Sequence, residues 1–207
     1  MNTDMHEGKT VAGNTENGGG RRGSRWRIAV WGTAAFILLL PFLAMQFTDE
    51  VAWDLADFAI VGAMLVGACG TYELAARVTD NTTYRFAVGV GLAAALILVW
   101  LSLGVGIIGR DGDPANLMYF GVLAVAIMGA LIARFQPLGM ARALSATALA
   151  QTSVAVIALI AGFGYPWSGA LELSALNGFF VALFVASAWL FRRAAHGQPE
   201  RHSECGG

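Results

Sequence analysis

The sequence predicts an all-α integral membrane protein, a bundle of six transmembrane helices, and three observations support this. The chain of 207 residues is 57% hydrophobic and 13% charged, with a mean hydropathy of +0.61, a combination that soluble domains rarely show. Its apolar residues fall into runs of about 20, the length that a helix needs to cross a bilayer. The basic residues lie almost entirely on one side of the resulting zigzag.

The predicted helices leave almost no chain for a soluble domain. They form a transmembrane domain at residues 26–193 and cover residues 27–47, 55–77, 86–108, 115–134, 142–163 and 173–191. Residues 1–25 are polar, and they and residues 194–207 are predicted to be disordered tails. The first helix is predicted to be an uncleaved signal anchor, because its apolar run is long for a signal peptide and no small-x-small cleavage site follows it.

The distribution of charge predicts the orientation of the helices. All of the 13 Lys and Arg residues except Arg110 fall on one side of the zigzag. The positive-inside rule therefore places both termini in the cytoplasm. The other side is acidic and carries Asp49, Glu50, Asp54, Asp57, Asp111, Asp113 and Glu172.

Similar residues recur with a period of about 58 residues, as in proteins built from repeats. Arginine opens the odd-numbered helices and closes the even-numbered ones, at Arg27, Arg77, Arg85, Arg134, Arg142 and Arg192. The opposite helix ends carry "DLAD", "DPAN" and "SALN". The simplest interpretation is three tandem helical hairpins. Alternating topology and chance alignment of apolar helices produce the same pattern, so both interpretations stay open.

The stretch "DGDPANLMYFG" at residues 111–121 interrupts two apolar runs with acids, glycines and a proline. Asp113 is a good N-cap, and Pro114 suits the first helical position. Asn116 then falls in the first turn, near the positive end of the helix dipole. The stretch is predicted to be a turn and a helix start rather than an active-site loop.

Small residues spaced four residues apart, or a multiple of four, predict the faces through which helices approach one another in lipid. Such residues occur in the second to fifth predicted helices, at Ala59, Ala63 and Gly67, at Ala87, Gly91 and Ala95, at Gly121 and Gly129, and at Ala143, Thr147, Gln151 and Ala155. They predict a tight bundle with little room for a large cofactor. Aromatic belts are expected at the two membrane surfaces, formed by Trp53, Tyr119, Tyr165 and Trp167 outside and by Trp26, Tyr72, Tyr84 and Trp189 inside.

Glu73 is the one acid predicted to lie within a helix away from the outer boundary. Ionisable groups in a membrane are candidates for function, and a single carboxylate of this kind suits a proton or cation relay. Glu73 also precedes Arg77 by four residues, the favourable order for an ion pair on one helix. The ion pair is the preferred interpretation and transport the alternative.

Gln151 belongs to "AQTSV", a polar group near the middle of the fifth predicted helix. The hydroxyls of Thr152 and Ser153 can bond back to their own helix, whereas Gln151 needs a partner on another helix or a water. Hydrogen bonding between helices or subunits is the preferred role, and a polar solute path is the alternative.

Asp57, Asn116 and Asn177 occupy equivalent places in the repeat. Brought together, they would form a polar ring at the outer mouth, which could be a weak cation vestibule. Helix capping explains the same residues and is preferred.

No catalytic, cofactor or metal site is predicted. His6, His196 and His202 all lie in the predicted tails, so no predicted helix carries an axial haem ligand. Cys69 and Cys205 are far apart and form no zinc or redox motif. Phosphate-binding loops and hydrolase motifs are absent, as is a nucleic-acid-binding pattern.

The phrases "MQFTDEVAWDLADF", "VGIIG", "DPANLMYFGVLAV", "LIARF" and "GMARAL" resemble a group of small polytopic bacterial inner-membrane proteins with no assigned activity. The resemblance covers most of residues 27–193. It implies a bacterial inner-membrane location and carries over no catalytic residue. We therefore expect a non-enzymatic membrane protein, an accessory or scaffold subunit or a self-associating bundle whose partners are the bilayer and other membrane proteins. A small-solute or ion transporter using Gln151 and Glu73 is the alternative.

Overall fold

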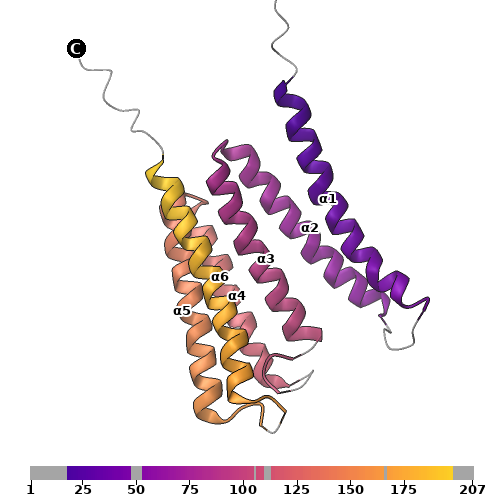
Figure 1. The fold of residues 1–207 in the computed structure, drawn as a ribbon, viewed down its shortest axis with the longest axis vertical. Coiled ribbons are helices and arrows are strands. Elements are labelled where there is room, and N and C mark those ends of the chain that lie inside the picture. The colour runs from indigo at the N-terminus through magenta and orange to yellow at the C-terminus, as the bar shows by residue number, and fades with distance from the viewer. Residues whose placement is uncertain (1–17, 48–52, 105, 110–112, 166, 198–207) are drawn as a thin grey trace, which may run out of the picture. The chain divides into compact units, whose positions relative to one another are not determined.

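The computed structural model of the chain describes residues 18–47, 53–104, 106–109, 113–165 and 167–197. Within these ranges the protein contains helices and no strand (Figure 1). The elements are α1 (Gly18–Ala44), α2 (Leu55–Val78), α3 (Thr82–Gly104), the short 3-10 helix η1 (Pro114–Leu117), α4 (Met118–Ala133), α5 (Pro137–Ala161) and α6 (Ala170–His196). The predicted all-α class is confirmed for this part of the chain.

In the described part of the chain, six helices are long and apolar enough to cross a membrane, with η1 and α4 forming one continuous span. They indicate a multi-pass membrane protein. The spans are Arg27–Ala44, Leu55–Arg77, Thr82–Gly104, Pro114–Ala133, Pro137–Ala161 and Ala170–His196.

Several helix ends differ from the predicted ones. α1 begins at Gly18, within the segment predicted to be a tail, and α3 ends at Gly104 rather than near residue 108. α5 begins at Pro137, which occupies the first turn, where a missing N–H costs nothing. α6 continues to His196. The rest of both predicted tails lies outside the described residues.

The chain divides into two compact units, residues 1–61 and 62–207. The first unit contains α1 and the start of α2, which is held by two reciprocal hydrogen bonds. The Asp54 N–H donates to Asp57 Oδ2 and the Asp57 N–H donates to Asp54 Oδ1, both at 2.9 Å. This is a capping box in which an aspartate takes the usual place of glutamate, and it explains why α2 starts here.

The second unit is built around a ring of four helices. α5 packs against α4 and α6, and α3 packs against α6 and, less extensively, against α4 (Figure 1). Large side chains fill the interior, among them Leu98, Tyr119, Phe180, Phe184 and Phe191. The outer surface of the ring is also apolar, as expected of helices that face lipid.

Close approach of α4 and α5 depends on two glycines. A Cβ added at Gly129 would lie 2.7 Å from the Cβ of Ala143, and one added at Gly139 would lie 2.8 Å from the Cβ of Ala133. Neither position has room for a side chain. Gly121 and Gly67, which the small-residue pattern also assigned to contact faces, have nothing within 4 Å of an added Cβ. Within the second unit the pattern therefore identified a contact at Gly129 and failed at Gly121.

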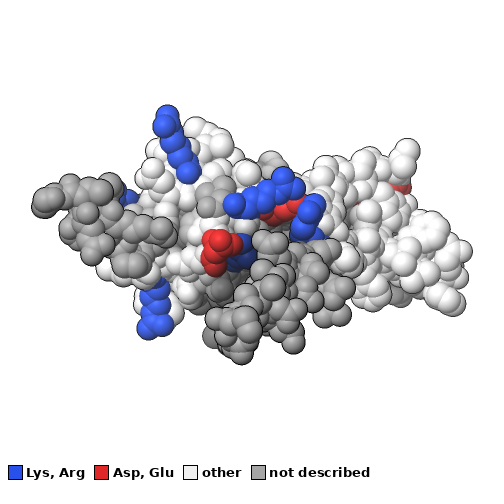
Figure 2. Space-filling view, turned by 90° about the horizontal axis from the view of Figure 1, so that it is seen from above, with Lys and Arg blue, Asp and Glu red and all other residues white. Residues whose placement is uncertain are grey.

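The two ends of the second unit differ in charge. At one end lie the α2–α3 connection, the α4–α5 turn and the C-terminal turn of α6 (Figure 1), joined by hydrogen bonds from Asn81 Nδ2 to the Ala194 carbonyl and from the Tyr84 hydroxyl to the Phe135 carbonyl. We call this the basic end, and Figure 2 looks down on its basic side chains. By their places on the helices it carries Arg77, Arg85, Arg134, Arg142, Arg192 and Arg193.

The opposite end contains residues 106–109, η1 and the α5–α6 connection. The Gly109 N–H donates to Ser168 Oγ at 3.0 Å, which ties the two connections together. The charged residues described at this end are Asp113 and Glu172.

Candidate functional site

Three deeply buried polar side chains of the second unit meet where α4, α5 and α6 come together. Tyr119, Gln151 and Asn177 are 1%, 0% and 1% exposed. We refer to these three residues as the amide cluster. Gln151 lies in the middle of α5, Asn177 about two turns into α6, and Tyr119 in the first turn of α4.

Asn177 is the hub of the amide cluster. Its Oδ1 accepts hydrogen bonds from Gln151 Nε2 at 2.9 Å and from the Tyr119 hydroxyl at 3.1 Å. Its Nδ2 donates to the Leu173 carbonyl of its own helix at 2.9 Å. One side chain on α6 therefore binds both α4 and α5.

The orientation of both amides follows from the Leu173 carbonyl. A carbonyl oxygen only accepts hydrogen bonds, so the Asn177 amide must face it with nitrogen. Oδ1 of Asn177 is then an acceptor, and Gln151 must present nitrogen to it. The Oε1 of Gln151 points away from this contact and has no hydrogen-bond partner among the described residues.

The hydroxyl groups near Gln151 bond to their own helix. Thr147 Oγ1 donates to the Ala143 carbonyl, Thr152 Oγ1 to Ala148 and Ser153 Oγ to Leu149, each at 2.9 Å. This is the arrangement that the sequence predicted for Thr152 and Ser153. Thr147 is fully buried and lies one turn from Gln151 on the same face of α5.

Asn116 organises the turn before η1 rather than interacting with the dipole of its own helix. Its Oδ1 accepts from the Ile107 and Ile108 N–H groups at 3.0 and 2.9 Å, and its Nδ2 donates to the Ile108 carbonyl at 3.0 Å. These bonds explain why α3 stops early, because residues 107 and 108 bond to a side chain. Asp113 has the predicted capping role, since its Oδ1 accepts from the Ala115 N–H at 2.9 Å.

Each of the three residues proposed for an outer mouth has its own local partners. Asp57 belongs to the first unit, where it pairs with Asp54, while Asn116 binds the turn at residues 107–108 and Asn177 belongs to the amide cluster. The third copy of the repeated phrase, "SALN", lies inside α6, whose N-cap is Gly169. It is therefore not a cap, contrary to the prediction.

Glu73 forms the ion pair with Arg77 that the sequence predicted, with Arg77 Nη2 bonded to Glu73 Oε1. The side chain of Glu73 is 15% exposed and that of Arg77 is 68% exposed. Arg77 thus pairs with the carboxylate from the same helix, near the end of α2.

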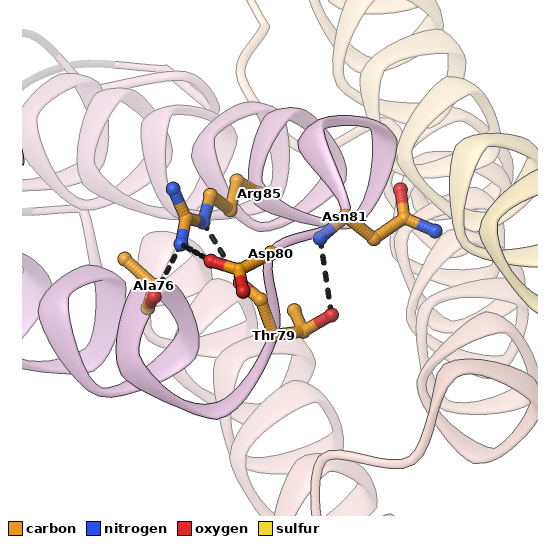
Figure 3. Close-up of polar contacts among 5 residues, drawn as sticks. All are labelled: Ala76, Thr79, Asp80, Asn81 and Arg85. Carbon is orange, nitrogen blue, oxygen red and sulfur yellow. Dashed lines mark hydrogen bonds and ion pairs between the residues drawn. The ribbon is translucent and has the colours of Figure 1, made fainter. Parts of the chain in front are cut away.

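A second polar cluster, which the sequence analysis did not single out, joins α2 to α3 at the basic end (Figure 3). Arg85 Nε donates to the Thr79 carbonyl at 2.9 Å, and its Nη2 bonds to the Ala76 carbonyl and to Asp80 Oδ1. Carbonyls at the end of a helix have no partner within it, and here one guanidinium on α3 satisfies two of those at the end of α2.

Asn81 starts α3 within this cluster. Its Oδ1 accepts from the Thr83 and Tyr84 N–H groups at 2.9 and 3.2 Å, which is N-capping. The run "TDNTTYR", with polar N-cap types before an apolar helix, is a signal from which this start could have been found.

Two tyrosines assigned to the surface belts are in fact buried. Tyr119 belongs to the amide cluster, and Tyr84 is 3% exposed, packs edge-on against Phe191 and donates to the Phe135 carbonyl. A tyrosine near a helix end suits a belt and an interhelical hydrogen bond equally well, and its sequence position does not separate the two.

Among the described residues, no group of three or more His, Cys, Asp or Glu side chains is arranged to hold a metal ion. No protein-family model, curated protein or solved structure matches the chain. The amide cluster, the Glu73–Arg77 pair and the Arg85 cluster are thus the features on which a function can be argued.

Proposed function

We propose that this protein is a non-enzymatic multi-pass protein of the bacterial inner membrane, either an accessory or scaffold subunit or a self-associating bundle. The observation that carries the proposal is the hydrogen bond from Gln151 to Asn177, which joins α5 to α6. Gln151 lies in the middle of α5, and its side chain is fully buried. The polar residue best placed to meet a solute instead joins helices.

The other polar groups within the spans support the same role. Ser187 Oγ donates to the Ala87 carbonyl at 2.7 Å and joins α6 to α3, and Glu73 is paired with Arg77. Interhelical hydrogen bonds of this kind hold bundles together in lipid. A core held by interhelical hydrogen bonds, with an apolar exterior, suits a protein that binds other membrane proteins.

The test is purification of the full-length protein from its native membrane in a mild detergent, followed by cross-linking and mass spectrometry. A scaffold is expected to bring down the same membrane protein, or further copies of itself, in fixed proportion. A protein that remains a monomer and recovers no partner, both before and after cross-linking in the intact membrane, would contradict the proposal.

A small-solute or ion transporter is the second candidate, favoured by the unpartnered Oε1 of Gln151. Flux into liposomes that contain the protein separates the two. Transport predicts flux that Gln151→Leu or Glu73→Gln abolishes while the variants remain folded. Scaffolding predicts no flux from wild type and weaker assembly of Gln151→Leu, with Ser153→Ala on the same helix as the unaffected control.

We further propose that the basic end faces the cytoplasm, so that both termini do as well, and that the chain arose as three tandem hairpins. The gathering of arginines at one end of the second unit supports the orientation. The repeat is supported by equivalent arginines near the starts of α3 and α5, Arg85 and Arg142. The resemblance to small bacterial inner-membrane proteins supports the location.

A further inference from the structure

The amide cluster contains a hydrogen-bond acceptor that no part of the described protein satisfies. Gln151 is fully buried, and its Oε1 has no partner. Rotating the amide does not relieve this, because Gln151 would then direct oxygen at Asn177 Oδ1, itself fixed as an acceptor by the Leu173 carbonyl. A buried polar group without a partner is costly, so native proteins rarely leave one unpaired.

Tyr119 and Thr147 offer further hydrogen-bonding capacity near Gln151. The hydroxyl of Tyr119 and Nε2 of Gln151 both donate to Asn177 Oδ1, so these two groups are close to one another. The hydroxyl of Tyr119 accepts no hydrogen bond from the described residues and keeps its capacity to accept one. The hydroxyl of Thr147 donates a hydrogen bond to the Ala143 carbonyl and can still accept one. The site therefore offers several acceptors to a molecule that brings protons.

The chemistry of the cluster restricts what that molecule is. Tyr119, Gln151, Asn177 and Thr147 are uncharged, and a buried cation needs a charged partner to offset the loss of its hydration. The burial of all four side chains, none more than 1% exposed, leaves no opening for a large molecule. A small neutral donor with two protons fits both conditions, and buried waters make two to four such bonds.

We propose that one internal water molecule is bound between α4, α5 and α6, donating one hydrogen bond to Gln151 Oε1 and a second to the hydroxyl of Thr147 or Tyr119. It completes the amide cluster, so that the bond between α5 and α6 consists of a direct amide contact and a bridging water. The site is a permanent part of the bundle and does not depend on which partner the bundle binds.

The test is a structure of the full-length protein crystallised from a lipid mesophase, at a resolution that shows ordered waters. Wild type is expected to show a single-atom peak about 2.6–3.2 Å from Gln151 Oε1, within hydrogen-bond range. Gln151→Met, which keeps the length of the side chain but has no amide, is expected to lose the peak. Ser153→Ala, on an exposed part of the same helix, is expected to keep it.

Three results would overturn the proposal. The first is a protein N–H or O–H group bonded to Oε1 in wild type, the second is an empty site at that resolution, and the third is elongated density, which would identify an organic solute and favour transport. Should Gln151→Met fail to fold, solid-state NMR of wild type with labelled glutamine replaces it. Magnetisation transfer from a bound water to the Gln151 amide supports the site, and its absence when the other buried amides are visible contradicts it.

Discussion

At the scale of single residues, Asn177 combines three contacts that a smaller side chain could not make. Its oxygen receives one hydrogen bond from α5 and one from α4, and its nitrogen is held by the carbonyl of Leu173 on its own helix. Loss of this side chain leaves a buried amide and a buried hydroxyl without their acceptor. Loss of the Tyr119 hydroxyl, by contrast, leaves Asn177 Oδ1 with the hydrogen bond from Gln151.

Asn177→Ala is therefore expected to destabilise the protein by about 1–3 kcal/mol, the cost of leaving buried polar groups unsatisfied. Tyr119→Phe is expected to cost less, about 0.6 kcal/mol, the average for hydrogen bonds between helices in a membrane. The free energy of unfolding is measured by SDS titration in mixed micelles. Ser174→Ala, one turn away on the exposed face of α6, is the control, and an equal effect of Asn177→Ala and Ser174→Ala would show that the hub contributes nothing.

At the scale of elements, the contact between α4 and α5 is a contact of backbones. Gly129 faces both the Cβ and the Cα of Ala143, at 2.7 and 3.2 Å from where its own Cβ would be. Gly139 faces Ala133 in the same way. Because lipid is as apolar as the helix surfaces, close packing rather than exclusion of water joins such helices, and even one added methyl group opposes it.

Gly129→Ala is expected to destabilise the bundle by about 1–3 kcal/mol, the usual cost of overpacking, although alanine is the better helix former by about 1 kcal/mol. Gly121→Ala on the same helix, with open space at the site, is the matched control and is expected to be neutral or stabilising. The same SDS titration measures both variants. If the two substitutions change stability in the same direction, the close contact at Gly129 does not hold in the membrane.

At the scale of the whole molecule, the two ends of the second unit carry different charges. Arginines lie near the starts of α3 and α5, near the ends of α2 and α6 and at the C-cap of α4, while Asp113 and Glu172 lie at the opposite end. Some of these arginines also have structural roles, as Arg85 does in satisfying the end of α2. Orientation and local stability therefore depend on the same side chains.

Reporter fusions test the orientation directly. A periplasm-active reporter joined after Gly109 is expected to be active, because the positive-inside rule keeps the arginine side in the cytoplasm. A cytoplasm-active reporter joined after Gly197, at the end of α6, is expected to be active as well. Activity of the reverse pair would show that the basic end faces outward.

The sequence by itself determined the features that depend on neighbours along the chain. The lengths of the apolar runs predicted six helices, and the six spans of the described residues agree with them. Glu73 and Arg77 are four residues apart on one helix, and Asp113 caps the helix that it precedes. A helix brings such residues together wherever it lies, so local spacing was enough.

The tertiary structure alone decided which faces meet. Gln151 was predicted to need a distant partner, but the sequence could not name Asn177, since an amide bonds equally well to many groups. The aromatic pattern assigned Tyr119 to a surface belt, and only the packing of the helices shows that it is buried. The small-residue pattern treated Gly129 and Gly121 alike, and only the packing shows that Gly129 contacts α5 whereas Gly121 does not. The physical reason is the solvent. In water, the periodicity of apolar residues shows which face of a helix is buried. In lipid, both the buried face and the lipid-facing face are apolar, so the same pattern does not show which face contacts another helix.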